Sequence, residues 1–470
     1  MFAKIQRIHF VGIGGIGMSG IAEVLLTLGY GVSGSDLRHS PVTARLISLG
    51  AQVFEGHRAE NVHGAGAVVT SSAISRDNPE VAEARRLKLP LIQRAEMLSE
   101  LMRLKYGIAV AGMHGKTTTT SMVASVLAAG GLDPTVVVGG RVDAMGSNAR
   151  LGTSQYLVAE ADESDRSFLK LSPILSVVTN IDREHMDCYR DMEDIERTFV
   201  EFMDRVPFYG TVVACHDNEP LRALLPRVTR RVVTYGRHSD ANFQITGYST
   251  VVRVQDRVRQ RFAVVFDGRE LGEFEVRAVG EHNVLNATAA VAVGIGLDIP
   301  VEKIREGIAN FGGVDRRFQL KGNGDGILVV DDYGHHPTEI RATLASARHW
   351  LEPGGRVHVI FQPHRYTRTY LLMDEFAAAF PDADRLLVLD IYAASEQPIA
   401  GVNGLTLASR IHCAGERPAE FAASFPAAVD AVLQEAKPGD LILTLGAGNV
   451  SQLGPQIVER LQARTAAAGS

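Results

Sequence analysis

The segment from Gly107 to Ala129 constrains the fold of this chain more than any other part of the sequence. An apolar run, Gly107–Val110, is followed by a glycine-rich turn over residues 111–116 and by an amphipathic stretch that ends at Ala129. This order predicts a strand, a tight turn and a helix. Backbone N–H groups of such a turn, together with the positive end of the helix dipole, form a cradle for a polyphosphate.

Two side chains make this turn more specific. Lys116 adds a cation for the β- and γ-phosphates of a nucleotide, and Thr117 adds a hydroxyl for Mg²⁺. The standard form of the loop has a further glycine five residues before its Gly-Lys pair, where this chain has Val110. We therefore predict an ATP-binding loop of a shortened type, with a simple glycine-rich turn and a solvated lysine as the alternative.

Length and composition limit the class of protein. A chain of 470 residues is too long for one core and predicts roughly three domains. A hydrophobic content of 46% and a charged content of 22% are ordinary for a globular protein, and a net charge of −6 gives no sign of a nucleic-acid partner. The three cysteines lie far apart, as expected in a reducing cytoplasm. No run of about 18 apolar residues occurs, so no membrane span is expected.

The pattern of apolar runs divides the chain into three α/β blocks. Residues 1–106 and 317–470 alternate short apolar runs with amphipathic ones, which predicts mostly parallel sheets covered by helices. The middle block, 107–316, begins with the phosphate-binding turn. Its part from Arg227 to Val279 is β-branched and alternating, and this predicts an antiparallel insertion.

A second glycine motif lies near the N-terminus. Residues 12–17, Gly-Ile-Gly-Gly-Ile-Gly, lie between a predicted strand and a predicted helix, and Asp36 follows about twenty residues later. The glycines allow close approach of a diphosphate, and the acid can bind ribose hydroxyls. A UDP-sugar and NAD both satisfy this pattern, and a tight turn that serves packing alone is the other interpretation.

Further polar clusters follow predicted strands. Glu160–Asp165 supplies acids that can hold Mg²⁺ beside a phosphate loop, with a solvated acidic loop as the alternative. His185 could bind a second metal, but a lone histidine is usually structural, and both interpretations stay open. Asp331–Pro337 and Gln362–Arg368 end two strands of the third block, where open α/β sheets place ligands. Arg316-Arg317 is a further cationic cluster, suited to charge on a transferred phosphoryl group.

In this order the motifs resemble those of the muramyl ligases of peptidoglycan synthesis. The resemblance covers essentially the whole chain and runs through residues 9–20, 114–117, 160–165, 280–287, 331–339 and 362–369. Tyr333-Gly334 favours the family member that joins L-alanine to the lactoyl carboxylate of UDP-N-acetylmuramate over the ligase that recycles murein tripeptide. The resemblance implies that the reaction runs through an acyl-phosphate intermediate and releases ADP and phosphate. It also implies that ATP and two Mg²⁺ ions are the cofactors. A cytoplasmic monomer or homodimer is expected.

The resemblance also implies a domain plan. Residues 1–106 would form a Rossmann-like domain for the UDP-sugar, and residues 317–470 a C-terminal Rossmann-like ligase domain. Residues 107–316 would form a central P-loop-type ATPase domain with a mostly parallel sheet and a small antiparallel one.

Roles are implied residue by residue. The UDP-substrate would contact Gly14, Gly15, Ile16, Gly17, Ser35, Asp36, Ser71 and Ser72 in the first domain, and Tyr333, His335, Arg365 and Arg368 in the third. ATP would contact Gly112, Met113, His114, Gly115, Lys116, Thr117, Thr118, Asn283, Asn286, Arg317 and Asp332. Mg²⁺ would be held by Thr117, Glu160 and His185. The catalytic residues would be Lys116, His185, Arg317, His335, Arg365 and Arg368.

The chain departs from the family pattern at a few places. Met113 stands where the family often has threonine, and Arg166 where it often has glycine. Related ligases use a carbamylated lysine at the second metal, but no lysine occurs between Lys170 and Lys303. We therefore expect no such modification in this protein.

Two other functions fit part of the sequence. An NAD-dependent oxidoreductase would use residues 12–17 and Asp36 but leaves the phosphate loop at Lys116 unexplained, and a nicotinamide absorbance change would reveal it. A non-catalytic nucleotide switch has no use for the polar strand ends at Asp332 and Arg365, and an absence of substrate-stimulated phosphate release would favour it.

Overall fold

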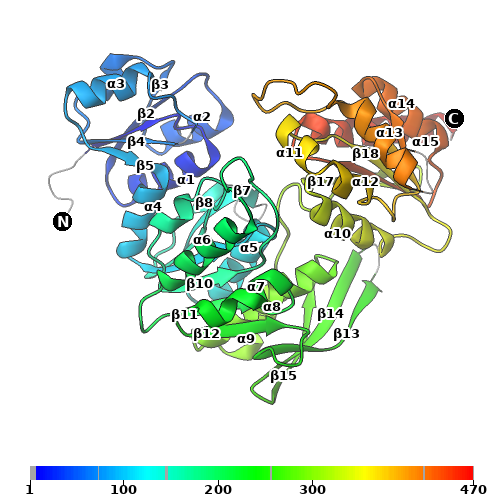
Figure 1. Cartoon of the computed structure of the whole chain (residues 1–470), viewed down its shortest axis with the longest axis horizontal. Coiled ribbons are helices and arrows are strands. Elements are labelled where there is room, and N and C mark those ends of the chain that lie inside the picture. Colours follow the sequence, from blue (N-terminus) through cyan, green and yellow to red (C-terminus); the bar gives the residue numbers. More distant parts are fainter. Residues whose placement is uncertain (1–6, 72, 143–146, 255–256, 416–418, 469–470) are drawn as a thin grey trace. The chain divides into compact units, whose positions relative to one another are not determined.

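The computed structural model describes residues 7–71, 73–142, 147–254, 257–415 and 419–468 (Figure 1). In this part of the chain the strands form three sheets, each accompanied by helices. By internal contacts the chain divides into two compact units: residues 1–248, 261–276 and 285–312 form one, and residues 249–260, 277–284 and 313–470 form the other. The domain boundaries expected near residues 106 and 316 stay predictions.

The N-terminal sheet has the strand order β3-β2-β1-β4-β5 with every pair parallel. This is the start of the doubly wound order, in which loops at the carboxyl ends of the central strands receive ligands. β1 and β4 are almost entirely buried, as expected for central strands covered on both faces. Its elements are β1 Arg7–Val11, α1 Ile16–Thr27, β2 Gly31–Asp36, α2 Pro41–Ser48, β3 Gln52–Glu55, β4 Ala67–Thr70, α3 Pro79–Arg86, β5 Leu91–Gln93 and α4 Arg94–Arg103.

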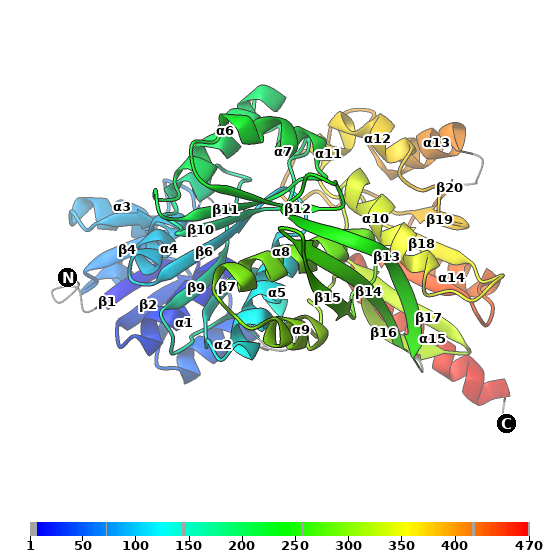
Figure 2. The ribbon, with the colours of Figure 1, turned by 90° about the horizontal axis from the view of Figure 1, so that it is seen from below.

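The central sheet has the order β15-β14-β13-β12-β11-β10-β6-β9-β7-β8. Figure 2 shows α5, α8 and α9 on one face of its parallel part and α6 and α7 on the other. The elements are β6 Tyr106–Ala111, α5 Lys116–Ala129, β7 Thr135–Val142, β8 Ser147–Arg150, β9 Tyr156–Glu160, β10 Leu175–Val178, α6 Met192–Asp204, β11 Thr211–Cys215, α7 Glu219–Leu224, β12 Val232–Gly236, β13 Phe243–Val254, β14 Arg257–Phe266, β15 Arg269–Val276, α8 Glu281–Gly296 and α9 Val301–Ala309.

The antiparallel insertion predicted from Arg227 to Val279 is confirmed only in its last part, because β12 pairs in parallel with β11 and with β13. β14 and β15 are joined by only Asp267 and Gly268, a connection too short for a parallel crossover. Both residues have positive φ, 47° and 75°, which is the two-residue hairpin turn that Asp-Gly favours.

The C-terminal sheet has the order β16-β17-β21-β18-β19-β20, in which β16 is antiparallel to β17 and the other pairs are parallel. Two hydrophobic clusters, one around Phe361 and one around Ile360, bury adjacent residues of the same strand. The elements are β16 Gln319–Gly324, β17 Ile327–Asp332, α10 Pro337–Arg348, β18 Val357–Phe361, α11 Tyr366–Leu371, α12 Met373–Ala377, β19 Arg385–Val388, α13 Gly404–Ala414, β20 Ala419–Phe421, α14 Phe425–Glu435, β21 Leu441–Leu445 and α15 Leu453–Ala468.

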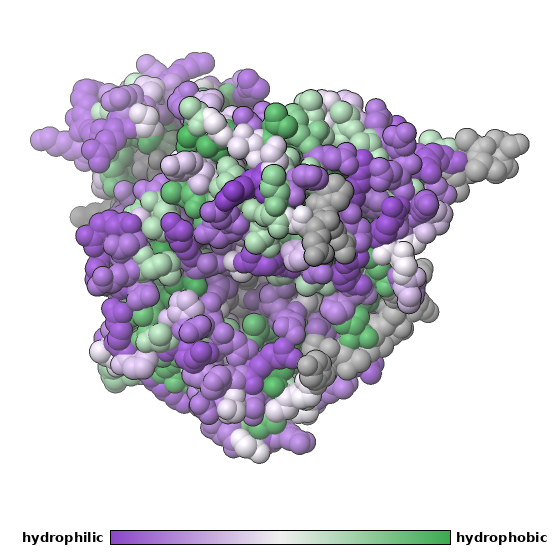
Figure 3. Space-filling model, turned by 45° about the vertical axis from the view of Figure 1, so that its right-hand side comes forward, coloured by the Kyte–Doolittle hydropathy of each residue, from purple (hydrophilic) through white to green (hydrophobic). Residues whose placement is uncertain are grey.

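None of the helices described is both long enough and apolar enough to span a bilayer. Among the coloured residues of the face in Figure 3, hydrophilic ones predominate and hydrophobic ones lie in small separate groups. This is the pattern of an ordinary globular surface.

Candidate active site

The glycine loop after β1 is bound to the end of β2. The N–H groups of Gly12 and Ile13 donate to the carbonyl oxygen of Ser35, at 2.8 and 2.9 Å, and Gly14 N donates to Oδ2 of Asp36 at 2.8 Å. A Cβ on Gly14 would lie 2.8 Å from the same Asp36 oxygen, so only glycine allows this approach. Asp36 therefore holds the loop in shape.

The serines predicted for the same site differ in their surroundings. Ser35 is fully buried, and its hydroxyl donates to Oε2 of Glu80 at 2.5 Å. Ser71 follows β4 directly and is half-buried. Ser72 and the side chain of Ile16 lie outside the described residues. Glu80, on α3, was not anticipated from the sequence.

The phosphate-binding turn has the predicted form, a strand (β6), a loop and a helix (α5). Gly112 and Gly115 have φ of 132° and 79°, and a Cβ on Gly112 would lie 2.0 Å from Oγ1 of Thr179. Lys116 is the first residue of α5, and Thr118 is buried in the same first turn. The glycines therefore serve both the turn and its close contact with the neighbouring strand.

Lys116 is held at the loop by three acceptors. Its Nζ donates to the carbonyl oxygens of Gly112 (2.7 Å) and Met113 (3.1 Å) and to Oε1 of Glu163 (2.7 Å). Burial acts to lower the pKa of Lys116, but the charges of Glu163 and Glu160 outweigh it and raise the pKa above its usual value. The lysine is therefore a cation at any physiological pH.

A group of oxygen and nitrogen donors lies beside this lysine. Thr117 Oγ1 donates to Oε2 of Glu160 at 2.9 Å, and His185 Nε2 lies 3.4 Å from Oε1 of Glu163. Glu163 is 1% exposed, and its Oε2 has no hydrogen-bond partner among the described residues. Carboxylate and hydroxyl oxygens with one imidazole fit a divalent cation such as Mg²⁺. Glu163 is therefore a further candidate site residue, which the sequence pattern of the acidic segment 160–165 does not distinguish from its neighbours.

His114, in the same loop, is fixed by polar partners. Its N–H donates to Oδ1 of Asn180 at 2.9 Å, and its Nε2 lies 2.9 Å from Oδ2 of Asp182. Both partners follow β10, so the loops after two neighbouring strands are joined at this edge of the sheet. This is where a parallel sheet places a ligand.

Arg166, one of the departures from the family pattern, has φ of 60°. This left-handed conformation is one that glycine adopts without strain. The arginine is held there by an ion pair with Asp194, a hydrogen bond to the Cys188 carbonyl oxygen at 3.2 Å and a contact 4.6 Å above the Tyr189 ring. These contacts offset the strain, and Tyr189 in turn donates to the carbonyl oxygen of Glu163 at 2.6 Å.

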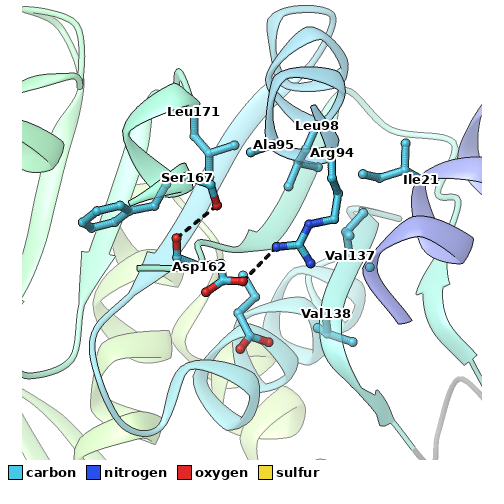
Figure 4. A pocket seen from close by; sticks show the side chains of 12 residues that line it. Ile21, Arg94, Ala95, Leu98, Val137, Val138, Asp162, Ser167 and Leu171 are labelled. Atoms are coloured by element: carbon cyan, nitrogen blue, oxygen red, sulfur yellow. Dashed lines mark hydrogen bonds and ion pairs between the residues drawn. The ribbon is translucent and has the colours of Figure 1, made fainter. Parts of the chain in front are cut away.

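A cavity of about 270 Å³ connects the first glycine loop with these acids. Figure 4 shows Arg94, from α4, pointing towards Asp162, with Ile21 of α1 and Val137 of β7 on the other side. The Arg94 guanidinium donates to Asp162 at 2.8 Å. The lining also includes Gly17, from the glycine motif, and Glu160.

The two predicted adenine contacts lie one turn apart on α8. Asn286 is buried, and its Oδ1 accepts a hydrogen bond from Thr119 Oγ1 of α5 at 3.0 Å. The Asn283 amide donates to the Val279 carbonyl oxygen at 3.1 Å. Asn286 thus lies against the helix that begins with the phosphate loop.

Asp332, at the end of β17, is buried and takes three hydrogen bonds. Its Oδ2 accepts from Phe318 N at 2.7 Å, and its Oδ1 accepts from Gly334 N at 2.7 Å and Thr343 Oγ1 at 3.2 Å. Burial raises the pKa of Asp332 above its usual value, against the opposing effect of Arg317.

The two adjacent arginines before β16 flank one aromatic ring. Arg316 and Arg317 lie with their guanidinium carbons 5.0 and 5.2 Å from the centre of the Tyr333 ring. Arg316 is also engaged by Asp331, at 3.1 Å. Arg317 lies 3.5 Å from Oε1 of Glu339, a partner that the sequence analysis did not select.

The polar segments after β17 and β18 meet, as predicted. The rings of His335 and His364 are 6.0 Å apart, and Arg368 Nη1 donates to the His364 carbonyl oxygen at 3.1 Å. Arg365 has φ of 71°, and its guanidinium lies 3.8 Å from Glu396. Burial, with the charges of His335 and Arg368, lowers the pKa of His364 to about 3. A cationic site with a neutral histidine therefore lies at this edge of the sheet.

Comparison with known proteins gives matches along most of the chain. Residues 7–106 match the family model described as "Mur ligase family, catalytic domain", residues 110–294 the "Mur ligase middle domain", and residues 316–448 the "Mur ligase, glutamate ligase domain". The chain is 69% identical to the UDP-N-acetylmuramate–L-alanine ligase of Koribacter versatilis, with all of both chains covered. It is 65% identical to the enzyme of the same name from Acidobacterium capsulatum, over 99% of each chain.

Solved structures agree with these matches. The UDP-N-acetylmuramate–alanine ligase of Thermotoga maritima superposes with a TM-score of 0.80 at 31% identity, covering 97% of this chain and 99% of that one. A murein peptide ligase of Psychrobacter arcticus has a TM-score of 0.69 at 24% identity, a likeness of fold alone.

Proposed function

The chain belongs to the Mur ligase family, and we propose that it joins L-alanine to the lactoyl carboxylate of UDP-N-acetylmuramate, with ATP converted to ADP and phosphate. The observation that carries this proposal is the end-to-end match to relatives with this activity in their names, at 69% and 65% identity. The geometry of the site supports it, because each required charge has a residue suited to it.

The chemical difficulty is to bring an anionic carboxylate to an anionic phosphate. The carboxylate oxygen attacks the γ-phosphorus of ATP, ADP leaves, and an acyl phosphate results. The amine of alanine then attacks the acyl carbon, and the tetrahedral intermediate collapses to the amide and inorganic phosphate. Fixed positive groups offset the charge as it gathers, an effect worth several kcal/mol.

Three features of the central domain fit the phosphate end of this reaction. The N–H groups of the loop from Gly112 to Thr117 receive the phosphates, and Lys116 supplies the cation beside them. Thr117, Glu160 and His185 are suited to hold Mg²⁺, which when bound neutralises phosphate charge, and Glu163 lies next to them.

The cavity at Arg94 supports a path for the sugar. UDP bound by the loop at Gly14–Gly17 would place its muramoyl group towards the cavity, which reaches from Gly17 to Glu160. Arg94 offers a guanidinium in this lining, although Asp162 already accepts from it. The carboxylate to be activated would then approach the same acids that are suited to hold the metal.

The C-terminal cluster is suited to the second substrate. Arg365 and Arg368 can each bind a carboxylate in two parallel hydrogen bonds. Arg368 donates to His364, whose ring lies 6.0 Å from that of His335, and His335 in turn contacts Tyr333. Arg317, on the Tyr333 ring, supplies a further cation for the transferred phosphoryl group. Asp332 and Asn286 are assigned to ATP by the family pattern.

A phosphate-release assay tests the proposal. Purified protein with ATP and Mg²⁺ should release phosphate only when UDP-N-acetylmuramate and L-alanine are both present. Glycine and L-serine in place of alanine measure selectivity, and Lys116→Met serves as the inactive control. Phosphate release that does not change when either substrate is omitted would refute the ligase function.

A further inference from the structure

A buried carboxylate lies behind the glycine loop of the N-terminal sheet. Glu80, in the first turn of α3, has no exposed surface. Its Oε2 accepts from Ser35 Oγ at 2.5 Å, and its Oε1 accepts from Asn61 Nδ2 at 2.6 Å. The imidazole nitrogens of His57 and His9 face Oε2 at 3.3 and 3.7 Å. One side chain therefore joins β1, β2, the segment after β3 and α3.

The carboxylate is charged in this environment. Burial acts to raise the pKa of Glu80, but the contacts with His9, Ser35 and Asn61 outweigh it and lower the pKa to about 2. An ionised acceptor makes shorter and stronger hydrogen bonds than a neutral one. The end of β2 is thus attached to α3 by a charge-assisted bond, although Ser35 and Glu80 are 45 residues apart.

The same end of β2 shapes the glycine loop. The backbone carbonyl of Ser35 accepts from Gly12 and Ile13, and the next residue, Asp36, accepts from Gly14. A displacement of Ser35 therefore moves three hydrogen bonds that define the loop. A loop rich in glycine has little else to restrict its conformation.

We infer that Glu80 is a positioning residue for the nucleotide diphosphate site: through the Ser35 hydroxyl it fixes the end of β2, and with it the loop at Gly12–Gly14. This inference rests on the proposed function, because it requires that the loop bind the UDP moiety. In this role Glu80 touches no ligand. Ser35 acts in the same way, through its backbone and its bond to Glu80.

Glu80→Gln is the informative substitution because it keeps the size of the side chain. The amide places an oxygen at only one of the two positions that Ser35 and Asn61 now face, so it cannot accept at both. If its NH₂ faces Ser35, the hydroxyl must reverse and accept, and in either orientation the charge that strengthens the bond is lost. Asn61 cannot simply turn its amide, because Nδ2 also donates to the Gly56 carbonyl oxygen at 3.2 Å. Ser35→Ala breaks the same link from the other side and leaves Glu80 its bond to Asn61.

We expect Glu80→Gln and Ser35→Ala each to raise the KM for UDP-N-acetylmuramate by about tenfold, the effect of losing one charged hydrogen bond. The kcat at saturation and the KM for ATP should stay within about twofold, since the phosphate loop lies on a different sheet. The double variant should be little worse than either single one, because both changes remove one interaction.

Glu83→Gln is the matched control. Glu83 lies one turn further along α3 and pairs with Arg86 and His63, whose side chains are 68% and 55% exposed. Its substitution should leave the KM values for UDP-N-acetylmuramate, ATP and L-alanine unchanged. Melting curves of each variant verify that the assays are run on folded protein.

The outcomes separate the two claims. A KM for UDP-N-acetylmuramate at the wild-type value in both Glu80→Gln and Ser35→Ala would overturn the inference, as would equal losses in kcat and in every KM, which indicate a merely structural role. A wild-type protein that does not require UDP-N-acetylmuramate would instead refute the proposed function. Calorimetric titration with UDP alone then still tests Glu80, since weaker UDP binding to Glu80→Gln supports the positioning role and equal binding contradicts it.

Discussion

Replacing Lys116 by methionine should destabilise the protein before any substrate is added. Lys116 Nζ lies 2.7 Å from Oε1 of Glu163, whose side chain is 1% exposed. Methionine keeps the unbranched stem but leaves the buried carboxylate without its cation, and breaking a buried pair in this way costs about 3–5 kcal/mol. His185 Nε2, 3.4 Å from the same oxygen, remains as a polar neighbour of the carboxylate and offsets part of the loss. We therefore expect the lower end of this range, about 3 kcal/mol.

Thermal unfolding followed by calorimetry measures this effect. For a domain of about 200 residues, a loss of about 3 kcal/mol lowers Tm by roughly 6–12 °C. The nearby charges raise the pKa of Lys116 above its usual 10.5, so the lysine is charged throughout the neutral range, and its contribution to stability is lost only as pH rises through the folded pKa. The difference in Tm between wild type and variant should therefore persist across neutral pH.

Two further variants make this test specific. Lys170→Met removes a lysine whose ion pair with Glu96 is exposed, with side chains 33% and 45% accessible, and such pairs contribute about 0–1 kcal/mol. Adding Glu163→Gln to Lys116→Met should restore most of the lost stability, because a neutral amide needs no counter-ion. A wild-type Tm for Lys116→Met, or no recovery in the double variant, would refute the reasoning.

Three other predictions concern the reaction and the C-terminal site. At least one of Arg365→Lys and Arg368→Lys should raise the KM for alanine or lower kcat by about ten- to hundredfold, since lysine cannot form the two parallel bonds of a guanidinium. Wild-type kinetics in both variants would remove this loop from the site. Because no lysine lies between Lys170 and Lys303, bicarbonate should not increase the activity of protein prepared at low CO₂. Burial lowers the pKa of His364 to about 3, so its NMR signal should not titrate between about pH 5 and 8. In the unfolded chain this histidine has its ordinary pKa of 6.5 and takes up the proton first, so the folded state loses stability relative to the unfolded state as pH falls below that ordinary value. A midpoint near that ordinary value would contradict this.

The phosphate loop could be predicted from the sequence because its signal is local. A strand, a glycine turn and a helix follow one another within residues 107–129, and each has its own pattern. The meeting of the segments at His335 and His364 could also be predicted, since strand ends of a parallel sheet share one edge.

Glu80 could not be predicted in the same way. Its partners Ser35 and Asn61 lie 45 and 19 residues away along the chain, and only the parallel pairing of β1, β2 and β3 brings them together. In sequence Glu80 is an acid in the first turn of a helix, where acids are common for reasons of the helix dipole.

The backbone strain at the site also could not be predicted from the sequence. His185, Arg316 and Arg365 have φ of 55°, 60° and 71°, in the region that glycine usually fills. Such conformations cost about 1–3 kcal/mol each and persist only where surrounding contacts enforce them. For Arg316 these contacts are visible: Asp331 and the Gly446 carbonyl oxygen bind its guanidinium.

Both glycine loops of this protein are supported by a buried acid from a distant part of the chain, but the two acids act differently. Glu80 faces the back of its loop and does not compete with a ligand, because it binds the Ser35 hydroxyl and not the loop itself. Glu163 binds Lys116 directly, at the nitrogen that a phosphate would also attract. A nucleotide phosphate that binds Lys116 must therefore weaken or break the bond between Lys116 and Glu163, and this lowers the net free energy of nucleotide binding. A divalent cation held beside Thr117 and Glu160, as proposed above, would relieve the same conflict, because it would offer the Glu163 carboxylate another positive charge. Binding of nucleotide and metal at this loop should for this reason be mutually supportive.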